Sequence, residues 1–271
     1  VGESGCGKST LGRCIARLYK PTAGQIRYQG ADLASLGQKA LLPHRRDIQM
    51  IFQDPMESLN ARHTVQEILE EPLVIHGIGS ASDRRKEVNR LLDLVGLPKR
   101  SATRFPFEFS GGQRQRIGIA RAIALRPKLI ICDEPVSALD VSIQSQILNL
   151  LLDLQSEFGL AYLFIAHDLA VVKHISDRIA IMYLGQIVET ASGDTVYQDP
   201  RHPYTQSLIS AIPVPDPTVK KERIILSGDV PSPIAPLSGC HFHPRCPACF
   251  EPCAETAPEL RETDAEHSVR C

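Results

Sequence analysis

Hydrophobic residues follow two different spacings in the second half of the chain. Two short runs, residues 129–132 and 160–166, are continuously apolar, as is typical of strands that are covered on both faces of a sheet. Residues 142–157, between these runs, have apolar side chains at helical spacing. A strand, an amphipathic helix and a second strand in this order predict a parallel sheet in an α/β fold.

A stretch with helical periodicity precedes these strands. In the predicted helix of residues 83–94, Val88, Leu91 and Leu92 share one face with Val95. Further strand-like runs occur at residues 25–28, 48–52 and 178–183. We therefore expect an α/β core with a helical insertion and a C-terminal extension, divided as follows: core residues 1–53 and 127–211, helical subdomain residues 54–126, and extension residues 212–271.

The composition of the chain changes at the C-terminal extension. The last 60 residues contain ten of the 20 prolines and five of the eight cysteines. Because proline lacks a backbone donor and disrupts helix interiors, we expect the extension to be mostly irregular. It has little apolar sequence from which to form a core, so we expect another kind of stabilisation there.

Charge and hydropathy argue against two classes of protein. The formal net charge is −1, which gives no electrostatic case for nucleic acid as the main partner. The longest apolar runs, such as residues 161–166, are far shorter than the roughly 20 residues that a membrane-spanning helix needs. A role at a membrane would therefore require other subunits. The chain starts at Val1, and we expect a strand before residue 2 to be missing, because a phosphate loop normally follows a buried strand.

Residues 2–9, Gly-Glu-Ser-Gly-Cys-Gly-Lys-Ser, match the phosphate-loop pattern G-x-x-x-x-G-K-[ST]. Glycines let backbone N–H groups point at phosphate oxygens, and the start of the following helix favours an anion. Lys8 is predicted to reach the β- and γ-phosphates, and the Ser9 hydroxyl to ligate Mg²⁺. Cys6 is interpreted as a small residue that fits the loop, with a reactive thiol as the alternative. The predicted nucleotide-binding residues here are Gly2, Glu3, Ser4, Gly5, Cys6, Gly7, Lys8, Ser9 and Thr10.

Polar residues follow three of the predicted strands. Asp133 is placed to hold Mg²⁺, and Glu134 to polarise a water aimed at the γ-phosphate. His167 follows the next strand and is predicted to contact the γ-phosphate and the attacking water. Gln53 ends an earlier strand and is predicted to touch Mg²⁺ or water. A plain polar strand end is the alternative for each residue, and the phosphate loop is what favours a nucleotide site.

Residues 109–116, Phe-Ser-Gly-Gly-Gln-Arg-Gln-Arg, resemble the signature motif of ATP-binding-cassette (ABC) proteins, with Phe109 where leucine is commonest. Residues 137–140, Ser-Ala-Leu-Asp, are similar to the D-loop of that family, and Gln53 and His167 are similar to its Q-loop and H-loop residues. The motifs occur in the family's order, and the resemblance covers essentially the whole chain. It implies a P-loop ATPase that converts ATP and water to ADP and phosphate.

The resemblance also implies how the site is completed. In the family, the signature motif of one cassette faces the phosphate loop of a second cassette, so that ATP is held between two subunits arranged head to tail. This role in trans falls on Ser110, Gly111, Gly112 and Gln113, and the D-loop role on Asp140. The helical subdomain would carry the motion of closure to two membrane-spanning permease subunits.

The extension resembles that of one subfamily. Residues 202–208, 228–233 and 239–247 are similar to the C-terminal region of oligopeptide and dipeptide importer ATPases, and residues 53–60 also resemble that subfamily. This implies a peripheral protein at the cytoplasmic face of a prokaryotic inner membrane, with an extracytoplasmic solute-binding protein as an indirect partner. Import of nickel or another small solute is the alternative within the subfamily. A soluble ABC ATPase or an exporter ATPase is the alternative outside it.

Cysteines of the extension match the four-cysteine pattern of that subfamily, and Cys249 is additional. The resemblance implies a [4Fe–4S] cluster bound by four thiolates: Cys240, Cys246, Cys253 and Cys271. Structural Zn²⁺, with His241 or His243 as substitute ligands, is one alternative, and free or disulfide-bonded thiols are the other. The expected role of a bound metal is structural.

Two groups of charged residues lie outside these motifs. Arg114, Arg116 and Arg121 follow the signature motif, and we interpret them as a solvated helix face, with phosphate or partner contact as the alternative. Three glutamates occupy the start of the helical subdomain: Glu67, Glu70 and Glu71. We leave two interpretations open for them, a simple exposed helix face and a docking site for a permease helix.

Overall fold

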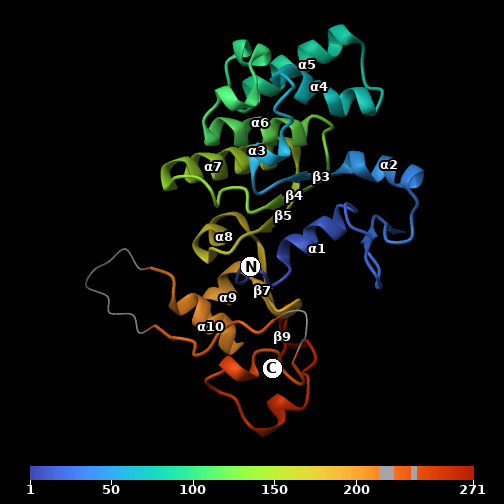
Figure 1. Cartoon of the computed structure of the whole chain (residues 1–271). Coiled ribbons are helices and arrows are strands. Elements are labelled where there is room, and N and C mark those ends of the chain that lie inside the picture. The colour runs from blue at the N-terminus through green and yellow to red at the C-terminus, as the bar shows by residue number, and fades with distance from the viewer. Residues whose placement is uncertain (214–222, 233–236) are drawn as a thin grey trace. The chain divides into compact units, whose positions relative to one another are not determined.

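The computed structural model describes residues 1–213, 223–232 and 237–271 of the chain. These residues form two compact units, which can be followed by colour in Figure 1. One unit consists of Val1–Lys8 together with Ala166–Cys271, and the other of Ser9–Ile165. Among the described residues, no helix is long and apolar enough to cross a bilayer.

A three-stranded parallel sheet forms the centre of the unit of residues 9–165. Its strands are β3 (Ile48–Ile51), β4 (Leu129–Asp133) and β5 (Ala161–Ile165), in the order β3-β4-β5. Helix α7 (Val141–Phe158) is the crossover between β4 and β5, which confirms the predicted strand, helix and strand. Ile51 lies opposite Cys132, so the carboxyl ends of β3 and β4 lie at the same edge of the sheet.

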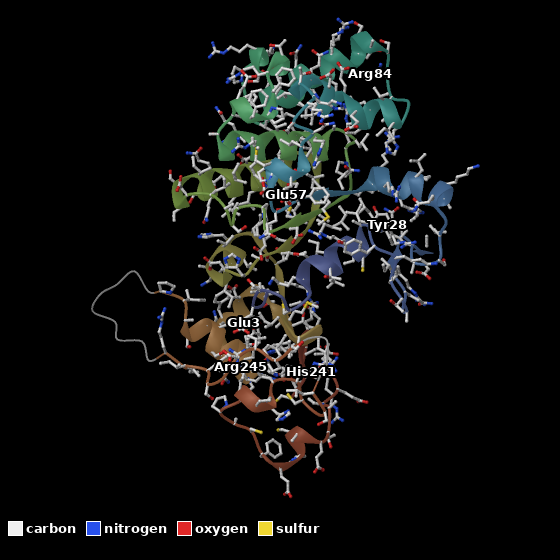
Figure 2. All side chains as sticks on the ribbon, viewed as in Figure 1. Glu3, Tyr28, Glu57, Arg84, His241 and Arg245 are labelled. Atoms are coloured by element: carbon white, nitrogen blue, oxygen red, sulfur yellow. The ribbon has the colours of Figure 1, made fainter. Side chains whose placement is uncertain are left out.

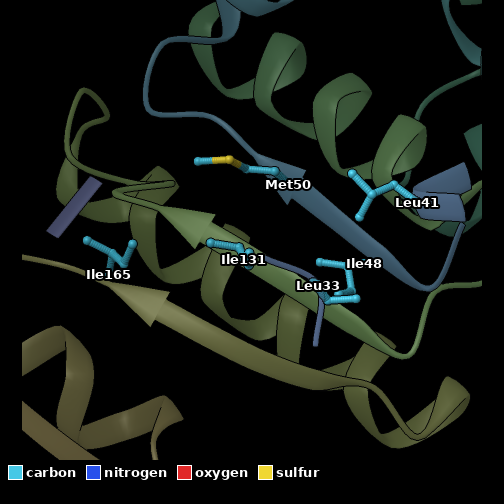
Figure 3. Packing of buried hydrophobic residues seen from close by; sticks show 6 residues of the cluster. All are labelled: Leu33, Leu41, Ile48, Met50, Ile131 and Ile165. Atoms are coloured by element: carbon cyan, nitrogen blue, oxygen red, sulfur yellow. The ribbon is translucent and has the colours of Figure 1, made fainter. Parts of the chain in front are cut away.

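The core of this unit packs against the sheet (Figure 3). Its buried side chains come from segments far apart in the sequence: Leu33, Leu41, Ile48, Met50, Ile131 and Ile165. Helix α1 (Lys8–Ile15) approaches the sheet closely at Gly12. A Cβ atom at Gly12 would lie 2.8 Å from Ile165 Cδ1 and 3.2 Å from Ile131 Cγ2. Glycine therefore sets how near the helix after the phosphate loop lies to β4 and β5.

Helices supply most of the remaining structure of this unit. The predicted helix of residues 83–94 is confirmed as α5 (Ala81–Leu94), which buries Val88, Leu91 and Leu92. A short antiparallel hairpin, β1 (Arg27–Tyr28) with β2 (Ala31–Asp32), replaces the strand expected at residues 25–28. The other helices are α2 (Gln38–Asp47), α3 (Pro55–Ser58), α4 (Val65–Ile75), α6 (Gly111–Ile123) and the 3-10 helices η1 (Lys99–Thr103) and η2 (Pro106–Glu108).

An antiparallel sheet forms the centre of the other unit. Its strands are β6 (Arg178–Tyr183), β7 (Gln186–Ser192), β8 (Arg261–Asp264) and β9 (His267–Val269), in the order β6-β7-β9-β8. The helical elements are α8 (Leu169–Ile175), α9 (Gly193–Gln198), α10 (Pro203–Ser210), η3 (His243–Arg245) and η4 (Glu251–Ala254).

The extension is less irregular than its composition suggests. Its last residues form β8 and β9, and β9 pairs with β7 through Glu189 opposite Val269. The sequence did not reveal these strands, because β8 is exposed throughout and β9 buries only His267 and Val269. Such short strands carry almost no hydrophobic alternation. Between residues 237 and 260, the helical structure is limited to η3 and η4, as the proline content predicts.

Candidate active site

Ser9 and Asp133 meet at the carboxyl end of β4. The Ser9 hydroxyl donates a 2.6 Å hydrogen bond to Asp133 Oδ1, and the Asp133 side chain is fully buried. Asp133 Oδ2 is also buried and has no hydrogen-bond partner among the described residues. A buried carboxylate oxygen without a donor is costly unless a cation or its water shell is nearby. The pair therefore fits Mg²⁺, which takes few protein ligands and completes its shell with phosphate and water oxygens.

Gln53 and Glu134 meet at the same edge of the sheet. Gln53 Nε2 donates to Glu134 Oε2 at 3.2 Å. Glu134 adopts a left-handed backbone conformation with φ 45°, and its N–H donates to the Ile165 carbonyl at 3.0 Å. Because this conformation is strained for a residue with a side chain, the bond to β5 helps to hold the turn. The structure thus brings four predicted site residues together in this unit, in two hydrogen-bonded pairs.

The phosphate loop forms around the Lys8 side chain in the other unit. Lys8 is buried, and its Nζ donates to the carbonyls of Gly2 at 2.7 Å and Glu3 at 2.9 Å. Gly7 has φ 100°, a conformation that favours glycine. A Cβ atom at Gly2 would lie 2.1 Å from the Met182 carbonyl oxygen of β6. Both glycines are therefore required for the loop to curl around the ammonium group.

The other residues of the phosphate loop differ in their burial and in their contacts. Cys6 is buried, which favours a packing role, and its Sγ accepts from Lys8 Nζ at 3.9 Å, so the alternative of a reactive thiol stays open. The Glu3 N–H donates to the Tyr204 hydroxyl at 2.9 Å, and its carboxylate pairs with Arg245. Ser4, Gly5 and Thr10 are exposed, as is His167 in the chain beyond β5. Their predicted contacts with nucleotide stay predictions.

The signature residues start helix α6. Ser110 is its N-cap: the Ser110 hydroxyl accepts from Gln113 N at 3.3 Å, and Gln113 Oε1 accepts from Ser110 N at 3.0 Å. This reciprocal capping box fixes the first turn of the helix. A Cβ atom at Gly112 would lie 2.6 Å from Ile143 Cγ2, and one at Gly111 would lie 3.4 Å from Leu139 Cδ2. The two glycines therefore let the D-loop segment and α7 pack directly against the start of α6.

A pocket of about 240 Å³ joins three of the predicted motifs. Its lining includes Gln53 of the Q-loop, Gly111 of the signature and Leu139 of the D-loop. Gln115 also lines it and is almost completely buried, with its Nε2 lacking a hydrogen-bond partner among the described residues. Asp140, the predicted D-loop residue, precedes α7 and is exposed. Motifs that are far apart in sequence are therefore neighbours in this unit.

The three arginines after the signature do not form the solvated face that the sequence suggests. Arg114 Nη1 donates to the Phe109 carbonyl at 2.7 Å, Arg116 Nη1 to the Val95 carbonyl at 2.7 Å, and Arg121 Nη1 to the Ser58 carbonyl at 2.5 Å. Burial lowers the pKa of Arg121. The acceptors are backbone carbonyls, which carry no sequence signature, so only the fold reveals these contacts. These hydrogen bonds connect α6 to the segments that pack around it.

Two of the three glutamates of the helical subdomain have local roles in the structure, and the third, Glu71, is exposed. Glu67 forms a capping box with Thr64 at the start of α4, and Glu70 Oε1 accepts from Gln66 Nε2 at 2.9 Å. The spacing Thr-x-x-Glu at residues 64–67 is a helix-start signal that could have identified this role from the sequence. The Thr64 hydrogen bonds lower the pKa of Glu67.

The cysteines of the extension do not form a metal site as they stand. Within the described ranges, no group of three or more His, Cys, Asp or Glu residues could hold a metal ion. The thiols are free, and the Cys240 N–H donates to the Cys253 carbonyl at 2.8 Å. Burial, with a smaller contribution from neighbouring cysteines, raises the pKa of Cys246 and Cys271. Among the described residues, the predicted [4Fe–4S] cluster and Zn²⁺ therefore find no assembled site, and both stay predictions.

Comparisons with known proteins agree with the motif order and the fold. The sequence model of the ABC transporter family matches residues 1–137, and that of the oligopeptide/dipeptide transporter C-terminal region matches residues 188–253. The oligopeptide transport ATP-binding protein OppF of Escherichia coli is 55% identical over 274 residues, covering 100% of this chain and 82% of OppF. The oligopeptide transport ATP-binding protein AppF of Bacillus subtilis is 54% identical, covering 100% of this chain and 83% of AppF.

Solved structures give the same result for the fold. A dimeric post-hydrolysis state of the ATP-binding cassette MJ0796, bound to ADP and phosphate, matches with a TM-score of 0.64 and 34% identity, covering 70% of this chain and 82% of that one. CbiO1 of Clostridium perfringens, part of an ABC transporter complex, matches with a TM-score of 0.65 and 27% identity, covering 73% and 78%. With its phosphate loop, its signature helix and its carboxylate pair in this order along the sequence, the chain belongs to the ABC transporter family.

Proposed function

We propose that this chain is the ATP-hydrolysing subunit of an importer for oligopeptides or dipeptides. The observation that carries the proposal is the match of residues 188–253 to the oligopeptide/dipeptide transporter C-terminal region, in a chain at least 54% identical over its whole length to two oligopeptide transport ATP-binding proteins. The family alone would support ATP hydrolysis, and the extension is what supports a peptide as the solute.

The phosphate-binding part of the mechanism rests on Lys8, Ser9 and Asp133. Lys8 exchanges the carbonyls of Gly2 and Glu3 for the β- and γ-phosphates of ATP. The Ser9 hydroxyl and Asp133 would hold Mg²⁺, directly or through water, and their 2.6 Å hydrogen bond already brings them together. Mg²⁺, when bound, supplies positive charge to the phosphate oxygens.

Proton transfer rests on Glu134. Its carboxylate accepts a hydrogen bond from the Gln53 amide, and we propose that it polarises the water that attacks the γ-phosphate. Gln53 acts as the sensor that releases Glu134 when it turns toward Mg²⁺ or water. His167 orients the same water and the γ-phosphate once ATP is bound. Attack of this water breaks the bond between the β- and γ-phosphates, releasing ADP and phosphate.

A second cassette completes each site. Ser110, Gly111, Gly112 and Gln113 offer the start of α6 to the ATP of the partner subunit, and Asp140 of the D-loop crosses toward it. The capping box of Ser110 supports this role, because it holds the first turn of the helix before any anion arrives. One chain alone therefore binds ATP but hydrolyses it poorly.

This chain would lie at the cytoplasmic face of a prokaryotic inner membrane. There it would pass the motion of dimer closure to two permease subunits that span the membrane. We propose that residues 54–126 act as the helical subdomain between core residues 1–53 and 127–211, and that residues 212–271 form the extension. A pocket of about 310 Å³ beside α4 and α5 would accept a permease segment. Leu73 and Ile78 line it together with charged residues such as Arg84, and the neighbouring Val74 and Ile75 are 54% and 63% exposed, which supports a contact that is partly apolar and partly ionic.

A metal site in the extension is a separate proposal that rests on the subfamily resemblance alone. A [4Fe–4S] cluster would require Cys240, Cys246, Cys253 and Cys271 to converge, and no step of the hydrolysis mechanism depends on it. Iron and acid-labile sulfide should be measured on protein purified without oxygen. About four irons per chain would support the cluster, about one zinc would support a structural Zn²⁺ site, and neither metal would leave free thiols.

The transport proposal is tested by purifying the full-length tagged protein from its native membrane in mild detergent. We expect two multi-span permeases and a second cassette ATPase to copurify. After reconstitution with the solute-binding protein, ATP should drive uptake of a labelled oligopeptide into vesicles. Uptake of nickel and not of the peptide would show that the importer carries another solute. Recovery with soluble DNA-repair or ribosomal proteins would contradict transport while leaving the ATPase intact.

A further inference from the structure

Arg245 of the extension forms a two-pronged ion pair with Glu3 of the phosphate loop. Arg245 Nη1 lies 2.9 Å from Glu3 Oε2, and Nη2 lies 3.2 Å from Glu3 Oε1. Both residues belong to the unit of residues 1–8 and 166–271, and Figure 2 labels them. Two parallel N–H···O bonds to one carboxylate fix the orientation of both groups. The extension therefore contacts the phosphate loop through a specific pair.

Aromatic side chains pack around Arg245. Its side chain is only 8% exposed, compared with 29% for Glu3. Its guanidinium carbon lies 6.0 Å from the centre of the Tyr183 ring, and Nη1 lies 3.5 Å from the Tyr183 hydroxyl. The rings of Tyr183, Tyr204 and Phe242 pack against one another with centroids 4.8 to 5.4 Å apart. Because the guanidinium is buried among these rings, its orientation toward Glu3 is restricted.

Glu3 connects this pair to the phosphate-binding lysine. The Glu3 carbonyl accepts from Lys8 Nζ at 2.9 Å, and the Glu3 N–H donates to the Tyr204 hydroxyl at 2.9 Å. The side chain, the amide and the carbonyl of Glu3 therefore all have defined partners. The carboxylate also places a negative charge inside the loop that has to receive the polyanion ATP, and Arg245 is the cation that compensates it.

We propose that Arg245 is a positioning residue for ATP binding: it neutralises Glu3 and, through the Glu3 carbonyl, holds Lys8 in place until the phosphates replace that carbonyl. The inference rests on the proposed nucleotide role of the phosphate loop. It gives the C-terminal extension a part in the affinity for ATP, although Arg245 itself touches no reacting atom. Without Arg245, the unpaired Glu3 carboxylate repels the triphosphate and weakens its binding.

The test compares variants of the full chain in its assembled transporter. Arg245→Met keeps the length and the packing of the side chain and removes the charge. We expect the KM for ATP to rise about tenfold, equivalent to about 1.4 kcal/mol, with kcat within about twofold of wild type. Arg245→Lys keeps the charge and should stay within about threefold of the wild-type KM. Equilibrium binding of a fluorescent ATP analogue should show the same order.

A double variant distinguishes loss of the charge that neutralises Glu3 from a general loss of the folded structure. Adding Glu3→Gln to Arg245→Met removes the uncompensated carboxylate, so the double variant should bind ATP more tightly than Arg245→Met alone. The matched control is Arg261→Met, because Arg261 belongs to the same extension, is 76% exposed and pairs only loosely with Glu259 at 3.8 Å. Its KM should equal that of wild type. Thermal unfolding of every variant shows whether the fold is kept.

The possible outcomes distinguish this inference from the proposed function. If wild type binds ATP and Arg245→Met binds it equally well, the positioning role is contradicted while the ATPase remains. A double variant that is as weak as, or weaker than, Arg245→Met would also overturn it, because the Glu3 charge would then not be the cause. A wild-type transporter that binds no ATP would contradict the proposed function itself and the inference with it.

Discussion

The Gln53 side-chain amide donates a hydrogen bond to the Glu134 carboxylate across neighbouring strands of the parallel sheet. The residue predicted to sense the γ-phosphate therefore restrains the residue predicted to activate water. The restraint is a single 3.2 Å bond at an exposed position, which is weak enough for ligand binding to break. We expect the carboxylate to become fully active only after Gln53 has turned toward Mg²⁺ and the phosphates.

Replacement of Glu134 by glutamine keeps the shape of the side chain and removes the base. We expect kcat to fall by at least about 100-fold, with ATP binding retained. Phosphate release measures the first effect, and gel filtration with ATP detects the dimer that should accumulate. Glu157→Gln, at an exposed position late in α7, is the control and should hydrolyse ATP normally. Undiminished turnover by Glu134→Gln would remove Glu134 from its role.

Removal of the Arg121 side chain should loosen the connection between the signature helix and the Q-loop. Arg121→Met deletes the donor to the Ser58 carbonyl and leaves that acceptor unsatisfied, at an expected cost of about 1–3 kcal/mol in the free energy of unfolding. Urea denaturation measures this loss. Arg62→Met, at an exposed position in the loop before α4, serves as the comparison and should change stability by less than about 0.5 kcal/mol. Equal losses would mean that the buried bond contributes little.

Two helical glycines should respond oppositely to alanine. At Gly12 a Cβ atom meets Ile165 Cδ1 at 2.8 Å, so Gly12→Ala should destabilise by about 1–3 kcal/mol and lower the Tm. At Gly118, inside α6, nothing lies within 4 Å of the added atom. Gly118→Ala should therefore be neutral or stabilising by up to about 1 kcal/mol, because alanine favours the helix. A Tm for Gly12→Ala at or above that of wild type would contradict the close helix-sheet approach.

Acid should destabilise the fold through His202. Burial lowers the pKa of His202 to about 4, although the nearby Glu189 acts in the opposite direction. The unfolded chain, with a pKa near 6.5, then binds more protons between pH 6.5 and 4, so stability falls as the pH drops through this window. We expect a loss of about 2 kcal/mol between pH 7 and pH 5 from this group.

The matched variant for this prediction is His202→Asn. His202 Nδ1 accepts from Tyr204 N at the start of α10, and asparagine can also cap a helix while it does not titrate. Denaturant unfolding at both pH values should show a smaller pH dependence for the variant than for wild type. Parallel pH dependence in the two proteins would show that His202 takes up its proton equally in the folded and unfolded chains.

Local patterns were sufficient for much of the site. The phosphate loop, the carboxylates after β4 and the signature at the start of α6 depend on residues that are close in sequence. Their backbone requirements, such as glycine at positive φ and a capping serine, restrict which residues can occupy each position. The parallel sheet was predicted from apolar runs, which are typical of strands covered on both faces; β4 is buried in this way, whereas β5 is only partly buried.

The partners of charged side chains were decided only by the tertiary structure. Arg245 and Glu3 are 242 positions apart, and Arg121 and Ser58 are 63 apart. An arginine in a sequence is equally compatible with solvent, with a carboxylate or with a backbone carbonyl, so its neighbours cannot be deduced from its own position. Strand β9 likewise exists because β7 offers an edge to pair with, and β8 because it pairs with β9, and not because of their own hydrophobic pattern. The sequence alone determined the chemistry predicted for the ATP site, and long-range packing decided which contacts hold its residues in place.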